Sequence, residues 1–173
     1  MKIAAPILFG WLRAAEAGLT FRDIADADLA FLARLYASTR ARELAAFPWS
    51  EAEKAAFLDM QFRAQHAHYR KQYPGADRLV TMLAGEAIGR LYLERRPGQH
   101  DIIDIAFLPE HRGKGLGTAL MRDLLDEAAE AGKAVSLHVE TSNPAMRLYK
   151  RLGFSTEEDN GVYVSMRWRA GTM

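Results

Sequence analysis

Three alternating glycines, Gly113, Gly115 and Gly117, follow an apolar stretch and precede an amphipathic one. A glycine has no Cβ, so the main chain can approach a ligand closely and point several N–H groups the same way. The helix expected after the glycines adds unpaired N–H groups and the positive end of its dipole. With the cations Arg112 and Lys114, this run favours binding of a phosphate or pyrophosphate. A tight connection without a ligand is the alternative that the glycines alone leave open.

Two common phosphate-binding motifs do not fit this run. GKGLGT lacks the final G-x-x-G spacing of the dinucleotide fingerprint, and no acidic residue ends a suitable second strand roughly 20 residues further on. The G-x-x-x-x-G-K-[ST] spacing of the P-loop is also absent. The run must therefore belong to another kind of anion-binding loop, if it binds an anion.

The spacing R-x-x-G-x-G, formed by Arg112, Gly115 and Gly117, resembles the acetyl-CoA loop of the GNAT superfamily of N-acetyltransferases. A second stretch, Ser136–Phe154, resembles the closing strand of that superfamily, its Asn-started helix and its final Tyr…Gly-Phe. The resemblance covers roughly residues 77–169 and is weaker before them. It implies acetyl-CoA as the acyl-donor cosubstrate, without a metal, and a cytoplasmic location.

The resemblance also implies which residues contact the cosubstrate. Main chain of the central strand would pair with the pantetheine arm, and the glycine-rich loop would hold the pyrophosphate. The residues implied for the arm are Ala106, Phe107 and Leu108; those for the pyrophosphate are Arg112, Gly113, Lys114, Gly115, Leu116, Gly117 and Thr118; Asn143 and Tyr149 complete the site.

Acyl transfer from a thioester needs a proton for the departing thiolate. Tyr149 lies in the run NPAMRLYKRLGF, where the resemblance implies this acid. A phenol, with an ordinary pKa near ~10, stays protonated at neutral pH until a thiolate leaves. The alternative is an aromatic helix residue that only packs in the core.

An alkyl amine is almost wholly protonated at neutral pH, so a base must take a proton before the amine attacks. His138 is the first candidate: counted back from Asn143, it falls where one branch of the superfamily carries a catalytic Glu. Asp101 is the second candidate. It lies as far before Arg112 as the catalytic Glu of another branch of the superfamily lies before that branch's Gln. Both can equally be surface or structural residues. Two further carboxylates are candidates for a water relay: Asp104 and Glu94.

We expect the acceptor pocket where the first two long helices meet, beside the last hairpin. Phe47 and Trp49 flank Pro48 there, either as packing residues or as a wall of the pocket. The other candidates in these helices are Arg40, Arg42, Glu43, His66 and Tyr69. The resemblance of the glycine-rich loop and of the Tyr149 motif implies an N-acetyltransferase that moves the acetyl group of acetyl-CoA to a primary amine by direct attack. A non-catalytic acyl-CoA-binding regulatory module is the alternative, because no residue is an unambiguous base.

Composition excludes several other classes of function. The formal net charge of +1 provides no global field to recruit nucleic acid or an anionic membrane. The absence of cysteine excludes disulfides, a cysteine nucleophile and thiolate metal sites. No apolar run approaches the ~20 residues of a membrane span, and the histidines lack a metal-ligand spacing. We expect no nucleic-acid, membrane or metal partner, and a homodimer stays open.

The length of 173 residues predicts one acyltransferase domain, residues 19–173, after an N-terminal extension, residues 1–18. The extension holds an apolar patch and an A-x-A pattern, loosely typical of a secretory signal. Pro6 and Arg13 interrupt that pattern. We therefore expect a short appended helix or an over-extended start rather than an export signal.

Periodicity and turn residues predict the element order β-α-α-β-β-β-α-β-α-β-β. The strands are expected at 19–24, 78–83, 88–94, 102–108, 134–140 and on both sides of a hairpin turn at 158–161; the helices at 27–38, 50–71, after the glycines to 132, and 143–153. This order predicts an α/β fold. The resemblance implies the same architecture, a GNAT-like three-layer sandwich with a twisted mixed, mostly antiparallel sheet of about seven strands and flanking helices.

Overall fold

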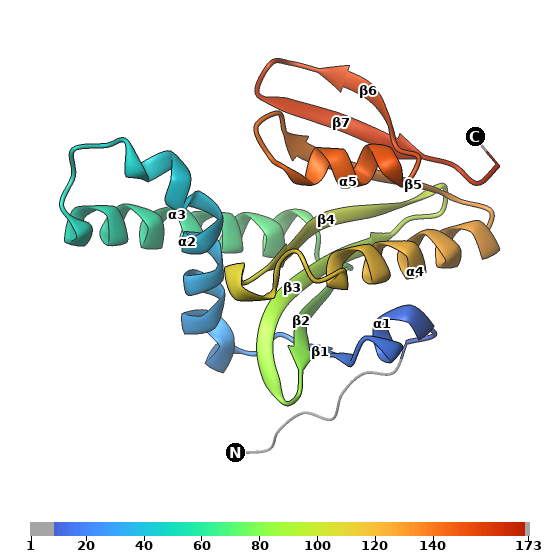
Figure 1. The fold of residues 1–173 in the computed structure, drawn as a ribbon, viewed down its shortest axis with the longest axis horizontal. Helices are drawn as coiled ribbons and strands as arrows, with labels where there is room; N and C mark the ends of the chain where they lie inside the picture. The colour runs from blue at the N-terminus through green and yellow to red at the C-terminus, as the bar shows by residue number, and fades with distance from the viewer. Residues whose placement is uncertain (1–8, 172–173) are drawn as a thin grey trace.

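The structure is a computed structural model that describes residues 9–171. Seven strands form one sheet between two layers of helices (Figure 1). Its strand order is β1-β2-β3-β4-β5-β7-β6. The strands are β1 (Leu19–Asp23), β2 (Asp77–Leu83), β3 (Glu86–Arg95), β4 (Gln99–Phe107), β5 (Ala134–Glu140), β6 (Ser155–Asp159) and β7 (Tyr163–Trp168). The predicted α/β sandwich is confirmed, and the predicted element order holds from β1 onward, with a short helix at Leu12–Glu16 before it. Residues 1–8 of the predicted N-terminal extension lie outside the described residues.

The sheet opens between its two central strands. Neighbouring strands are antiparallel except β4 and β5, which are parallel and paired only from Gln99 to Ile102. The register of β4 against β3 shifts just beyond Ile102, where Ile103 is an extra residue in β4. Such a bulge bends its strand. Beyond it, residues 103–107 of β4 and 138–140 of β5 are no longer paired with each other, and we call this unpaired part of the sheet the wedge.

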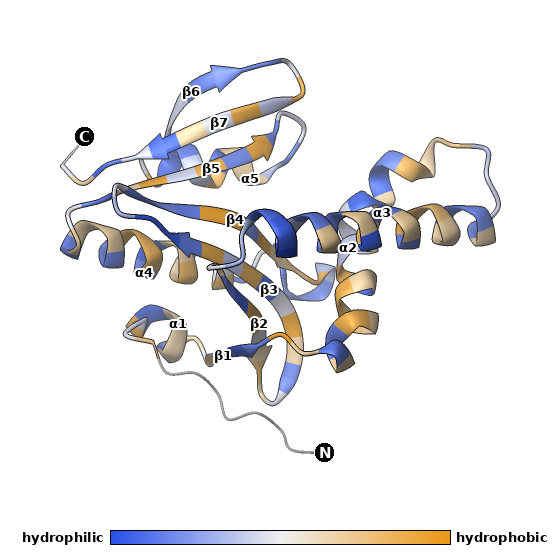
Figure 2. Ribbon diagram, turned by 180° about the vertical axis from the view of Figure 1, so that it is seen from behind, coloured by the Kyte–Doolittle hydropathy of each residue, from blue (hydrophilic) through white to orange (hydrophobic). Residues whose placement is uncertain are grey.

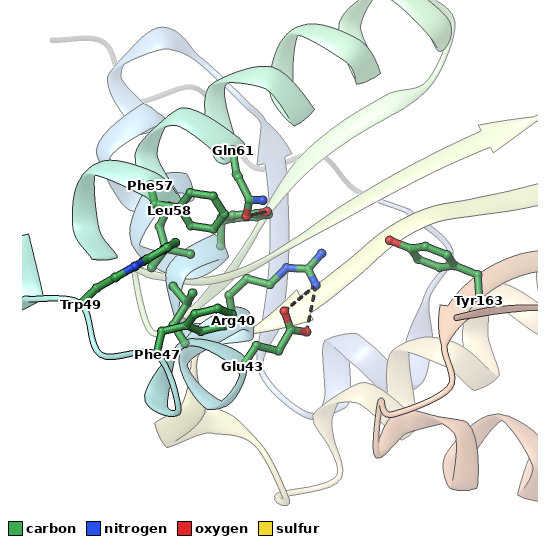
Figure 3. A pocket seen from close by; sticks show the side chains of 10 residues that line it. Arg40, Glu43, Phe47, Trp49, Phe57, Leu58, Gln61 and Tyr163 are labelled. Atoms are coloured by element: carbon green, nitrogen blue, oxygen red, sulfur yellow. Dashed lines mark hydrogen bonds and ion pairs between the residues drawn. The ribbon is translucent and has the colours of Figure 1, made fainter. Parts of the chain in front are cut away.

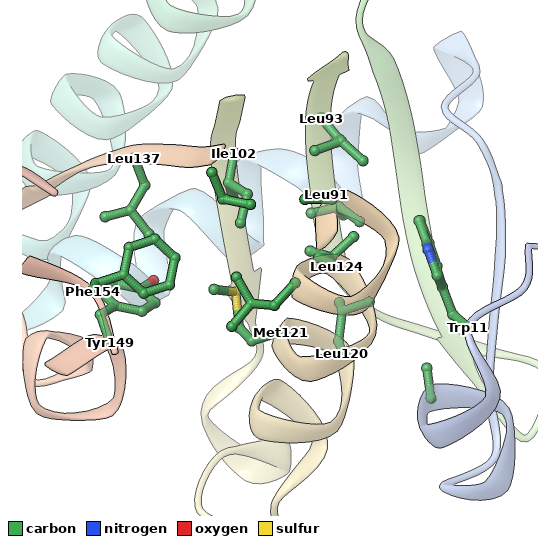
Figure 4. Close-up of a cluster of buried hydrophobic side chains, with 14 of the residues drawn as sticks. Trp11, Leu91, Leu93, Ile102, Leu120, Met121, Leu124, Leu137, Tyr149 and Phe154 are labelled. Carbon is green, nitrogen blue, oxygen red and sulfur yellow. The ribbon is translucent and has the colours of Figure 1, made fainter. Parts of the chain in front are cut away.

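One face of the sheet carries the larger core. Helix α4 (Leu116–Glu130) lies across it, with α1 (Leu12–Glu16) and α5 (Ala145–Arg151) on either side (Figure 4). Leu120 and Leu124 of α4 pack on Leu91 of β3 and Ile102 of β4 in this core. Trp11 is only 3% exposed, so the segment before β1 packs into the same core.

The other face carries α2 (Leu29–Ala45) and α3 (Glu51–Gln72), with a smaller core between them and the sheet (Figure 2). Helix α2 ends at Ala45, seven residues beyond residue 38, so its predicted end was wrong. Ser38 and Thr39 donate their hydroxyls to the carbonyls of Leu35 and Tyr36, so both fit within the helix. Ser50 caps α3 by accepting the amide of Glu53, as its capping sequence predicts. None of the helices described has the length and apolar character to span a membrane.

Candidate active site

The glycine-rich loop leaves a row of amides free at the start of α4. Gly115 is the N-cap of α4, with φ of 81°, and Gly113 has φ of 73°. Such left-handed angles favour glycine. Among the described residues, no acceptor takes a hydrogen bond from the amides of residues 113–118. A Cβ added at Gly113 or Gly115 would meet nothing within 4 Å, so there is room for a ligand beside them. Free amides, a helix dipole and open space together form an anion seat.

Neighbouring side chains fix this loop against the sheet. Arg112 donates from Nε to the carbonyl of Phe107 at 2.9 Å and from Nη2 to Ser38 Oγ at 3.3 Å. Leu116 is buried in the main core, and a Cβ on Gly117 would lie 3.6 Å from the Phe107 ring. Thr118 is half-buried and Lys114 exposed. Arg112 therefore ties the loop to β4 and α2, and Lys114 is the cation left at the surface.

The main chain of β4 presents only alternate residues to the wedge. Leu108 donates its amide to the carbonyl of Ile88 in β3, at 2.8 Å. Backbone groups of an antiparallel strand alternate in direction, so those of Ala106 also point to β3, whereas those of Ile105 and Phe107 face the wedge. The sequence prediction took residues 106–108 as one block and missed Ile105. The bulge that sets this alternation has no clear sequence signal.

Tyr149 lies where the wedge begins. Its ring packs on Phe154, with centroids 5.8 Å apart, close to Leu137, the last residue of β5 paired with β4 (Figure 4). The residue is 6% exposed, and no hydrogen bond to a described residue contributes to the pKa of its hydroxyl. Burial raises the pKa of Tyr149 to about 12, and the negative charge of Asp104 contributes. The phenol therefore keeps its proton and has it available for a ligand.

Asn143 and His138 lie on either side of the end of β5. The Asn143 side chain accepts the amide of Ala145 at 2.9 Å and so caps α5, which carries Tyr149. His138 is exposed and follows Leu137, so it lies at the edge of the wedge. Its neighbours Leu137 and Val139 are in the main core, so His138 points to the opposite face, toward α2 and α3.

Asp101 and Glu94 lie away from the wedge. Asp101 is opposite Ser136 in the paired part of β4 and β5. Its carboxylate is 2.9 Å from Arg96 Nε and accepts a bond from Gln99 at 2.6 Å. Glu94 is paired with the same Arg96, at 3.0 Å. Both carboxylates thus stabilise the β3–β4 hairpin.

Asp104, by contrast, belongs to the part of β4 that borders the wedge. Its carboxylate is 2.5 Å from Arg90 Nη2, and Arg90 is only 3% exposed. The same Nη2 donates to Gln65 of α3 at 2.9 Å. This buried pair places a fixed negative charge close enough to affect Tyr149.

A cavity of about 400 Å³ lies where the acceptor pocket was expected (Figure 3). We call it the acceptor pocket. Its lining residues come from α2, α3, their junction and β7; they are Tyr36, Arg40, Glu43, Leu44, Phe47, Trp49, Phe57, Leu58, Gln61 and Tyr163. Arg42 does not line this pocket, His66 lines another small cavity, and Tyr69 packs on Tyr92. The sequence analysis expected a pocket at this junction and beside the last hairpin, without naming Phe57 or Tyr163 among its residues.

Arg40 links the acceptor pocket to the wedge. Its Nη1 lies 2.6 Å from Glu140 of β5 and 3.1 Å from Glu43 of α2. Burial lowers the pKa of Arg40, but the hydrogen bond and charge of Glu140 outweigh burial and hold that pKa above its usual range. Because Glu140 shares a face of β5 with His138, the ion pair lies at the boundary between pocket and wedge.

No group of three or more His, Asp or Glu side chains within residues 9–171 is arranged to hold a metal ion. The polar groups along the wedge are instead main-chain amides, the phenol of Tyr149 and the imidazole of His138. The site is therefore suited to a phosphorylated ligand at one end, with proton transfer at the other.

One family model and several acetyltransferases match the chain. The sequence profile of the acetyltransferase (GNAT) family matches residues 32–154. The chain is 32% identical over 108 residues to the N-alpha-acetyltransferase RimI of Mycobacterium tuberculosis, covering 62% of this chain and 61% of the relative. It is 32% identical over 101 residues to an L-2,4-diaminobutyric acid acetyltransferase of Nocardia farcinica, covering 56% and 52%. These matches thus span only about half to six tenths of each relative.

A solved structure shows the same fold. The PaiA N-acetyltransferase of Thermoplasma acidophilum, solved in complex with coenzyme A, superposes with a TM-score of 0.66. It is 16% identical, and the match covers 87% of this chain and 98% of that one. At this identity the likeness establishes the arrangement of elements, including a sheet of the kind described above.

Proposed function

Since the chain belongs to the acetyltransferase (GNAT) family, we propose that it transfers the acetyl group of acetyl-CoA to a primary amine. The observation that carries this proposal is the placement of two features on one opening of the sheet. The free amides of residues 113–118 lie at one end of the wedge, and the unpartnered hydroxyl of Tyr149 lies at the other. The free amides would thus hold the diphosphate of an acyl-CoA, and its thioester would lie beside Tyr149 as the acid.

In this proposal the chain's own groups would hold acetyl-CoA along the open edge of the sheet. The amides of residues 113–118 would bind the diphosphate, with Lys114 as the nearby exposed cation. The main chain of Ile105 and the amide of Phe107 would pair with the pantetheine arm along the open edge of β4, since Arg112 already donates to the Phe107 carbonyl. Acetyl-CoA supplies an activated thioester, and holding it beside an amine can lower the barrier by roughly 7–11 kcal/mol.

Proton transfer is assigned to two residues. His138, exposed at the edge of the wedge, would take the proton from the acceptor's ammonium, directly or through water. The amine nitrogen then attacks the acetyl carbon to give a tetrahedral intermediate, which loses the second nitrogen proton to water as the carbon–sulfur bond breaks. Tyr149 would give its proton to the departing sulfur, and its high pKa keeps that proton in place until the thiolate leaves. We place this reaction in the cytoplasm, with acetyl-CoA as the cosubstrate.

Thiol release from acetyl-CoA, measured with a panel of primary amines, tests the proposal. Tyr149→Phe retains the ring and loses the proton, so kcat should fall by roughly 10²-fold or more, with little change in CoA affinity. Tyr73→Phe, at the C-terminal end of α3, is the matched control and should retain the wild-type rate. CoA binding without turnover of any amine would contradict the proposal and favour the non-catalytic acyl-CoA-binding module.

A further inference from the structure

We propose that the acceptor pocket selects a dicationic amine, with its apolar body against the aromatic wall and its second cation beside Glu43. This inference rests on the proposed function and names the class of acceptor. The amine that reacts would lie at the Arg40–Glu140 boundary with the wedge, and the second cation nearer the outer rim. Three independent features of the pocket support this choice.

The first feature is the aromatic wall. Trp49 lies between Phe47 and Phe57, with ring centroids 5.1 Å and 5.2 Å away (Figure 3). Phe47 is 46% exposed, so this wall is open at its rim. The face of an aromatic ring is negative, and an indole face attracts a cation most strongly. The wall therefore suits both an apolar chain or ring and a positive charge.

The second feature is an excess of negative charge. Two carboxylates, Glu43 and Glu140, share the single guanidinium of Arg40, through its Nη1. These three groups carry a net charge of −1, so Arg40 has no charge to spare for an anionic acceptor. The side chain of Glu43 is 51% exposed and faces the pocket, so a ligand can reach its carboxylate (Figure 3). A second ammonium on the acceptor would neutralise this excess.

The third feature is the shape of the path to the wedge. The pocket, at about 400 Å³, has the size of a small-molecule site. It is bounded on the β5 side by Arg40, which contacts Glu140, and Tyr163 approaches the same carboxylate at 3.5 Å. An acceptor that reaches His138 from this pocket must pass these groups. A diamine would place its second cation beside Glu43 while its reacting amine points past Arg40 and Glu140 toward the wedge.

Three probes that differ only at the para position of a benzylamine ring test the effect of a second charge. The compounds p-xylylenediamine, benzylamine and p-(aminomethyl)benzoate share one reactive aminomethyl group and one ring, and they carry a second cation, no second charge or an anion. We expect kcat/KM to be roughly tenfold higher for the diamine than for benzylamine, and lower again for the benzoate. Glu43→Gln should bring the diamine-to-benzylamine ratio close to one.

Glu51→Gln is the matched control, because it removes the same charge from an exposed position at the start of α3. It should preserve the wild-type ratio. A benzoate that reacts best, or a Glu43→Gln ratio equal to that of wild type, would overturn the inference.

Calorimetric titration of the same probes into CoA-saturated protein separates this inference from the proposed function. Tighter binding of the diamine than of the benzoate, weakened by Glu43→Gln, supports the pocket's selectivity even if no probe is acetylated. In that case only the proposed activity would fail. Equal or tighter binding of the benzoate would contradict the selectivity whatever the turnover.

Discussion

The surroundings of Tyr149 and Asp101 decide what each side chain can do. Burial raises the pKa of Tyr149 to about 12, and no described residue accepts its hydroxyl proton. Asp101 has the residue type of a base, but Arg96 and Gln99 already occupy its carboxylate. His138 is exposed at the edge of the wedge instead. The proposed chemistry therefore depends on Tyr149 and His138.

The role assigned to His138 predicts a pH-dependent loss of activity. His138→Gln should lower kcat/KM by roughly 10–100-fold near neutral pH, where an alkyl amine is protonated. The loss should shrink as pH approaches ~10, because the acceptor then loses its proton to solvent. Rates of thiol release between about pH 7 and 10 provide the measurement.

The comparison needs a histidine outside the site. His68 is exposed on α3, and His68→Gln should follow the wild-type profile. A deficit in His138→Gln that stays constant across the whole range would mean that the imidazole positions the substrate rather than taking its proton.

Helix α4 has two roles: it forms part of the anion seat, and it holds α1 against the core. Its first turn forms the anion seat, and Asp123, further along, holds α1 in place. The Asp123 carboxylate is 5% exposed and accepts the amides of Ala14 at 2.7 Å and Arg13 at 3.3 Å. These are otherwise unpaired amides at the start of a helix. The α1 segment, with Trp11, thus packs on the helix that carries the loop.

Asp123→Asn should destabilise the fold. Asn retains one acceptor oxygen, so its N–H donors would face one of the two main-chain amides, at a cost of about 1–3 kcal/mol. For a chain of this length, each kcal/mol lowers Tm by roughly 2–4 °C. Thermal unfolding followed by circular dichroism measures the change.

Asp126→Asn is the control at this position. Asp126 also pairs with Arg13, but its side chain is 58% exposed, so its loss should matter less. An equal decrease in Tm for the two variants would show that the buried hydrogen bonds of Asp123 do not hold α1.

Across the whole molecule, local features were predictable from the sequence and long-range pairings were not. The glycine loop, the helix periodicity and the capping sequence at Ser50 are all encoded within a few residues. The Arg40–Glu140 ion pair joins residues 100 positions apart, and no local pattern indicates it. The bulge that turns Ile105 toward the wedge depends on the register of β3 and β4. Trp11 lies in an apolar patch that is equally typical of a signal segment and of a core.

The central claim concerns the loop at the start of α4. Gly115 and Gly132 lie at opposite ends of this helix, with φ of 81° and 68°, and a Cβ at either would meet nothing within 4 Å. An alanine at either position incurs similar left-handed strain, about 1–2 kcal/mol. Only the methyl group at residue 115 would enter the space beside the free amides.

Calorimetric titration with CoA therefore tests the account most directly. We predict that Gly115→Ala raises the Kd for CoA at least tenfold, whereas Gly132→Ala leaves it within about twofold of wild type, although both variants lose similar stability. Equal CoA affinity in the two variants would contradict the account, because the amides of residues 113–118 would then not hold the diphosphate.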